Sequence, residues 1–120
     1  MNKKLNRLFK ANIDIIRLPE YTSYYSQEYK FPLLVIENLK GALKKPKVQF
    51  VRSEINDPFR KYSTSKFEPA QYSVEDYQLM KKYGLSPGHN APAGHHKSSM
   101  KEWATTFYHI NMTPQDIVLN

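Results

Sequence analysis

The chain has 120 residues and a formal charge of +7, from 18 Lys and Arg against 11 Asp and Glu, so it has room for one small domain. It contains no cysteine, which excludes disulfides, cysteine-ligated zinc and iron–sulfur centres, and thiol catalysis. With 40% hydrophobic residues the chain can bury a core, while no apolar run reaches the ~20 residues of a membrane-spanning helix.

Residues 1–20 form a basic N-terminal segment. The first ten residues carry four basic side chains and no acidic one, and their apolar residues share one possible helical face. This pattern is typical of a mitochondrial presequence, and it fits an ordinary N-terminal helix or tail equally well. Residues 1–50 hold ten Lys and Arg against four Asp and Glu, which favours phosphate-rich partners or a solvated basic surface.

Strands are predicted in the first half of the chain. Residues 21–30 are rich in tyrosine, which favours strands and either packs in a core or stacks on bases. Residues 33–36 form an apolar run that indicates a buried strand, and residues 48–51 alternate as a short strand.

A short helix is predicted to begin after Ser73. Ser73 is a suitable N-cap, and Asp76 stands at the position that completes a capping box. The helix is expected to run through Lys82 and to end at Gly84.

The last third of the chain is predicted to alternate loop, helix and strand. Residues 85–94 contain prolines and glycines and are expected to form a rigid, turn-rich loop. Residues 98–104 are expected to form a second short helix that Trp103 anchors to the core, and residues 105–112 a strand that ends at Thr113. This mixture predicts an α+β fold.

The polar residues between positions 84 and 120 suit phosphodiester chemistry. His89 follows a glycine in the proline-bounded loop, Asn111 ends the expected strand, and Asn120 follows an apolar run. A neutral histidine near an oxygen-ligated cation can take a proton from water, and an asparagine amide oxygen suits Mg²⁺. Of the other histidines, His95 and His96 are expected at the surface, and His109 is expected to pack in the core.

Three sequence stretches carry a family resemblance. Residues 84–93 read Gly-Leu-Ser-Pro-Gly-His-Asn-Ala-Pro-Ala, residues 106–115 read Thr-Phe-Tyr-His-Ile-Asn-Met-Thr-Pro-Gln, and residues 119–120 read Leu-Asn. In this order and spacing they resemble the DNA/RNA non-specific endonucleases, whose pattern is G-[FY]-D-R-G-H-x-x-P-A, then [FY]-x-x-S-N-x-x-P-Q, then L-N-x-x-x-W-x-x-L-E. The resemblance is weaker upstream, over residues 24–39.

The resemblance implies a fold and a set of roles. The implied fold is α+β with a ββα-metal (His-Me finger) core, a mixed sheet and short helices, here ending before the metal helix. His89 would be the general base, and Asn111 would be a second catalytic-site residue that supports the active site. Asn120 would hold the single catalytic Mg²⁺, and the substrates would be DNA and RNA. In these terms residues 21–120 are the N-terminal half of the endonuclease-like domain.

Two adjacent departures from the family pattern bear on phosphate binding. Ser86 and Pro87 stand where the pattern has Asp and Arg, so the chain lacks the arginine that would hold a phosphate. Lys81, Lys82 and Lys97 are candidates to compensate, although a lysine lacks the two-pronged geometry of a guanidinium. The sequence also ends at Asn120, before the Trp and Glu of the metal helix.

Three functions therefore remain open. The first is a Mg²⁺-dependent, sugar-non-specific endonuclease. The second is a catalytically inactive, nuclease-derived structural subunit whose partners are proteins or RNA in a larger assembly, for instance in a mitochondrial complex. The third is a split nuclease whose second half is a separate chain. The basic N-terminus and the family analogy favour a mitochondrial location, with another intracellular site as the alternative.

Overall fold

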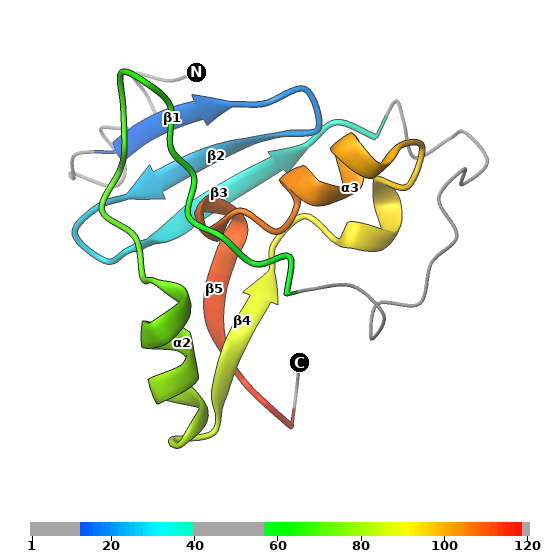
Figure 1. Cartoon of the computed structure of the whole chain (residues 1–120). Coiled ribbons are helices and arrows are strands. Elements are labelled where there is room, and N and C mark those ends of the chain that lie inside the picture. The colour runs from blue at the N-terminus through cyan, green and yellow to red at the C-terminus, as the bar shows by residue number, and fades with distance from the viewer. Residues whose placement is uncertain (1–12, 40–56, 119–120) are drawn as a thin grey trace.

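The computed structural model describes residues 13–39 and 57–118, which fold into two antiparallel β-sheets and short helices (Figure 1). Its strands are β1 (Ile13–Arg17), β2 (Tyr21–Ser26), β3 (Phe31–Glu37), β4 (Leu85–His89) and β5 (Met112–Asp116). Its helices are α2 (Val74–Lys81), α3 (Met100–Thr105) and the 3₁₀ turns η2 (Ala93–His95) and η3 (His109–Asn111). The predicted α+β class is therefore confirmed.

The first sheet has the strand order β1–β2–β3. It contains the strand predicted over residues 33–36 within β3, but the predicted burial is wrong, because Ile36 is 40% exposed and the three residues before it are only half-buried. The strand predicted over residues 48–51 lies outside the described residues. Residues 13–20, assigned above to the basic N-terminal segment, are built into this sheet through β1.

The tyrosines of β2 pack in the core and tie the sheet to the rest of the fold. Tyr21 and Tyr25 are fully buried and form one apolar cluster with Ile110 of η3. The Tyr21 hydroxyl donates a hydrogen bond to the Thr105 carbonyl oxygen at 2.8 Å, at the end of α3. The Ser23 hydroxyl donates to the Ile110 carbonyl oxygen at 2.7 Å. The C-terminal third of the chain is thus anchored on β2.

Helix α2 begins and ends where its sequence predicts. The Ser73 side chain accepts a hydrogen bond from the Asp76 N–H at 3.0 Å, and the Asp76 carboxylate accepts one from the Ser73 N–H at 2.8 Å. This capping box satisfies two amide donors that the first turn leaves open. After the helix, Gly84 adopts a φ of +78°, which few residues other than glycine tolerate, and the chain turns into β4.

The loop predicted over residues 85–94 is wrong for residues 85–89, which form strand β4. Only residues 90–94 of the predicted loop lie outside that strand. Pro87, which is predicted to lie in that loop, lies directly opposite Pro114 in the β4–β5 ribbon. At the two ends of the ribbon, the Ile117 N–H donates to the Gly84 carbonyl and the Asn90 N–H donates to the Asn111 carbonyl. Residues 84 and 117, and residues 90 and 111, are therefore hydrogen-bonded pairs, and along the ribbon such pairs alternate with non-hydrogen-bonded ones. Because these pairs alternate, the two prolines fall at a non-hydrogen-bonded position, where the ladder requires no N–H.

Helix α3 confirms the second predicted helix, with Ser99 as N-cap and Trp103 buried. The strand predicted over residues 105–112 is wrong, because α3 extends to Thr105 and the turn η3 (His109–Asn111) follows. Strand β5 begins at Met112, the residue at which the predicted strand was to finish. None of the helices within residues 13–39 and 57–118 is both long and apolar enough to cross a bilayer.

Candidate active site

His89 is the last residue of β4 and lies opposite Met112 of β5. Two aromatic rings flank its imidazole. Phe107 meets it edge-on, with ring centroids 4.5 Å apart and an interplanar angle of 89°. Phe59 lies at 5.7 Å and 54°, and the two phenylalanine rings contact each other at 5.0 Å. This packing limits the orientations open to the imidazole, as a catalytic group requires.

Asn111 fixes the chain segment that follows His89. It is fully buried, and its side-chain oxygen accepts a hydrogen bond from the Ala91 N–H at 2.8 Å. Its amide group donates to the Ala91 carbonyl at 3.0 Å and to the Thr106 carbonyl at 2.9 Å. Asn111 therefore links the loop after His89 to the end of α3.

Asn90 closes the ribbon beside His89. Its backbone N–H donates to the Asn111 carbonyl at 2.9 Å, and its side-chain amide donates to the same carbonyl at 3.0 Å. The side-chain amide also donates to the Thr113 hydroxyl at 2.9 Å. These bonds hold the residue after His89 to β5.

Gly88, the residue before His89, lies against the end of the Gln115 side chain. The Gln115 side chain crosses the glycine so closely that an added Cβ would lie 2.0 Å from the Gln115 Cδ. Any larger residue at position 88 must displace Gln115. The glycine of the Gly-His pair thus has a steric role in the ribbon.

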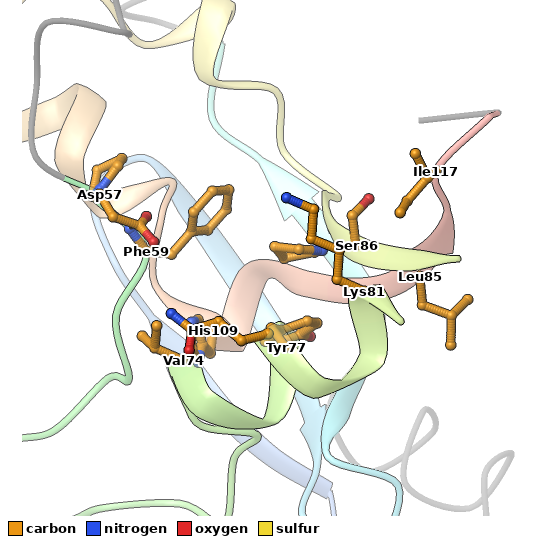
Figure 2. Close-up of a pocket in the computed structure, with 12 residues that line it drawn as sticks. Asp57, Phe59, Val74, Tyr77, Lys81, Leu85, Ser86, His109 and Ile117 are labelled. Carbon is orange, nitrogen blue, oxygen red and sulfur yellow. The ribbon is translucent and has the colours of Figure 1, made fainter. Parts of the chain in front are cut away.

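A pocket of about 640 Å³ opens between α2 and β4 (Figure 2). Its wall is mostly apolar and is formed by Asp57, Pro58, Phe59, Val74, Tyr77, Gln78, Lys81, Leu85, Ser86, Pro87, His109 and Ile117. Phe59 belongs both to this wall and to the aromatic contacts of His89. The pocket is therefore next to the candidate base, and Ser86 and Pro87, which depart from the family pattern, face it.

His109 packs in the core, as predicted, although in η3 instead of a strand. Its Nδ1–H donates to the Tyr72 carbonyl oxygen at 2.5 Å, and its ring meets Tyr77 edge-on at 5.2 Å. Its buried Nε2 has no hydrogen-bond partner among the described residues. Burial lowers the pKa of His109 below its usual value, because the charged imidazolium would lose its hydration.

The prediction that His95 and His96 are both surface residues is wrong for His96, which is 2% exposed. One carboxylate oxygen of Glu37 contacts both imidazoles, at 2.9 Å from His95 Nδ1 and 2.8 Å from His96 Nε2. Sequence reasoning missed this cluster because Glu37 is far away in the chain and belongs to β3. The cluster joins the end of β3 to the last residue of η2 and the residue after it.

The structure brings two of the three predicted site residues to one end of the ribbon. His89 and Asn111 lie there, and Asn120 lies outside the described residues. Sequence reasoning missed the two phenylalanines that flank His89, because no motif or periodicity connects them to it. Within the described ranges no three His, Asp or Glu side chains are grouped to hold a metal ion.

Comparisons with known proteins found related sequences and a similar fold. The sequence profile of the family described as DNA/RNA non-specific endonuclease matches residues 5–120. The mitochondrial nuclease EXOG of Danio rerio is 31% identical over 99 residues, which cover 80% of this chain and 26% of that protein. EndoG in its crystal structure with EndoGI aligns with a TM-score of 0.61 and 24% identity, over 94% of this chain and 45% of that one. The chain thus spans about a quarter of the curated relative and under half of the solved one.

Proposed function

Because this chain belongs to the DNA/RNA non-specific endonuclease family, we propose that it provides the general-base part of a site that hydrolyses phosphodiester bonds in DNA and RNA. The observation that carries this proposal is the placement of His89 at the end of β4, between two phenylalanine rings and beside the loop that Asn111 holds. A histidine so restrained can be aimed at one attacking water.

In the proposed reaction the His89 imidazole takes a proton from water while the water oxygen bonds to phosphorus. The bond from phosphorus to the leaving oxygen breaks, and that oxygen takes up a proton from solvent. Asn111 is a positioning residue here, because its hydrogen-bonding groups are used on the backbone of Ala91 and Thr106.

A divalent cation belongs to the same proposal. A carboxamide oxygen plus waters is a donor set that suits Mg²⁺, and we propose Asn120 as the protein ligand. Such a set needs no group of three acidic or histidine side chains. When bound, the ion would supply positive charge to the anionic transition state.

Plasmid nicking by the 120-residue chain, with Mg²⁺ or with EDTA, tests the proposal. We expect Mg²⁺-dependent nicking that falls on the order of 10²–10⁴-fold in His89→Ala, the usual effect of losing a general base. His95→Ala is the matched control, because His95 contacts Glu37 and is half exposed. Nicking that survives His89→Ala unchanged would exclude His89 as the base.

A second function, an inactive structural subunit with protein or RNA partners, is favoured by two observations. Pro87 removes the motif arginine, and the large apolar side chains of Tyr83 and Val118 are 80% and 90% exposed. If Pro87→Arg leaves the chain without nuclease activity, this second function gains support. If Pro87→Arg produces Mg²⁺-dependent nicking, the second function loses its main argument.

A mitochondrial location is proposed from the basic residues 1–20 and from the likeness to a mitochondrial nuclease. We expect a fluorescent protein fused behind these residues to colocalise with a mitochondrial dye in cells. A matched fusion in which the basic residues among the first ten are replaced by Gln should remain diffuse. Equal distributions of the two fusions would argue against a presequence.

A further inference from the structure

We propose that the pocket between α2 and β4 is a nucleotide subsite in which Lys81 binds a substrate phosphate and the apolar wall receives the attached nucleoside. This inference rests on the proposed function and deepens it, since it names a substrate contact that the family pattern does not contain. Each of its two parts, the phosphate and the nucleoside, is argued from the residues that line the pocket.

The phosphate part follows from the charge of the pocket wall. An anionic phosphodiester needs a cation beside it, and Pro87 supplies none. Of the described residues that line the pocket, Lys81 is the only Lys or Arg. The other two candidate lysines, Lys82 and Lys97, are not part of the wall. Figure 2 shows Lys81 reaching from α2 towards β4, the strand that carries Ser86 and Pro87.

The nucleoside part follows from the shape and chemistry of the remaining wall. A volume of about 640 Å³ is sufficient for a nucleoside, and the apolar surface includes the rings of Phe59 and Tyr77. Aromatic rings bind bases with little preference for sequence, as a non-specific nuclease requires. Gln78 and Ser86 add polar groups that can hydrogen-bond a base or a sugar.

The position of the pocket fits a nucleotide next to the reacting bond. Phe59 lines the pocket, and its ring centroid lies 5.7 Å from that of His89. An occupant of the pocket would therefore be separated from His89 by one side chain. Among the described residues of the wall, Asp57 is the single carboxylate, and its oxygen accepts a hydrogen bond from the Phe59 N–H at 3.0 Å. Because the Asp57 carboxylate would repel a phosphate, the phosphate is placed at Lys81 and the nucleobase on the side of Phe59.

Titration of the ¹⁵N-labelled 120-residue chain with thymidine 5′-monophosphate, in EDTA, tests the inference without any hydrolysis. We expect shifts of amide signals in α2 and β4 and a dissociation constant that Lys81→Ala weakens about tenfold, as for one lost charge-assisted contact. Lys82→Ala is the matched control and should change the constant less than about twofold, because its charge lies at the neighbouring position but outside the wall. Thymidine without phosphate should bind wild type and Lys81→Ala equally.

Restoring the motif arginine gives a second readout. Pro87 lies at a non-hydrogen-bonded position of the ribbon, so an arginine there keeps every ladder bond, and Pro87→Arg should recover nucleotide binding in the Lys81→Ala background. Equal affinities of wild type and Lys81→Ala, shifts outside α2 and β4, or no binding would each overturn the inference. A chain that fails to nick DNA yet binds the nucleotide through Lys81 would contradict the proposed function alone.

Discussion

Asn111 illustrates how one buried side chain can determine the geometry of a site without being free to react. Its carboxamide satisfies the N–H and C=O of Ala91 and the C=O of Thr106. We expect Asn111→Ala to lower the free energy of unfolding by about 3 kcal/mol, because the buried backbone groups it leaves lose their partners. Urea unfolding followed by circular dichroism measures this loss.

The matched control for that prediction is Asn38→Ala. Asn38 also donates its side-chain amide to a backbone carbonyl, that of Pro19 at 3.1 Å, but at an exposed position where water can replace it. We expect this control to cost less than about 1 kcal/mol. If both variants lose the same free energy of unfolding, the burial of the Asn111 hydrogen bonds contributes nothing to stability.

Gly88 offers a second prediction at the residue scale. Gly88→Ala should destabilise the fold by about 0.5–1.5 kcal/mol, because the new methyl group would lie 2.0 Å from the Gln115 Cδ and must turn the flexible end of that side chain away. In a Gln115→Ala background the same change should cost less than about 0.5 kcal/mol, since the obstacle is gone. A double-mutant cycle of urea unfolding measures this coupling, and additive losses would refute the steric explanation.

At the scale of elements, the capping box of α2 is a local device with a predictable energy. Ser73→Ala removes the side-chain acceptor of the Asp76 N–H and should cost about 1 kcal/mol. Ser65→Ala is the control, because Ser65 is an exposed residue outside the helices and strands. Thermal unfolding compares the two variants, and a Ser73→Ala chain as stable as the control would show that α2 is held by its tertiary contacts alone.

The elements also show which predictions the sequence can support. Helix α2 was predictable because its signals, the Ser73 and Asp76 pair and Gly84, act within a few residues of the helix. Strand β4 was not, because Pro87 is compatible with a strand only opposite a non-hydrogen-bonded partner, and that partner is 27 positions along the chain. The pairing of distant segments decides such cases, and local propensity does not report it.

The candidate site divides in the same way. The resemblance to the family pattern singles out His89 and Asn111 as candidates, and the structure brings them to one end of the ribbon. The aromatic contacts of His89 come from Phe59 and Phe107, and their neighbours Arg60 and Tyr108 form a bridge between segments that are far apart in the chain. The choice of Lys81 among three candidate lysines likewise needed the pocket wall.

At the scale of the whole molecule, the two sheets are joined through a small core that includes polar groups. Ile110 of η3 packs on the tyrosines of β2, and its neighbour His109 is buried between Tyr72 and Tyr77. A titratable group at this junction ties the stability of the fold to pH. Protonation of His109 would place a positive charge in the region where the ribbon, α2 and the first sheet meet.

The direction of this pH dependence follows from the pKa of His109, which burial lowers in the folded state. Below pH ~6.5, the usual histidine value, the unfolded chain binds a proton that the folded chain does not, so stability falls as the pH falls. Between pH 7.5 and 5.5 this one group should remove up to about 1.4 kcal/mol from the free energy of unfolding. His109→Gln keeps a donor for the Tyr72 carbonyl and should abolish the part of the pH-dependent loss of stability that comes from His109. In the control His95→Gln, at a half-exposed position, that part of the loss should remain. Urea unfolding at the two pH values measures the difference, and an undiminished pH dependence in His109→Gln would assign the acid sensitivity to other groups.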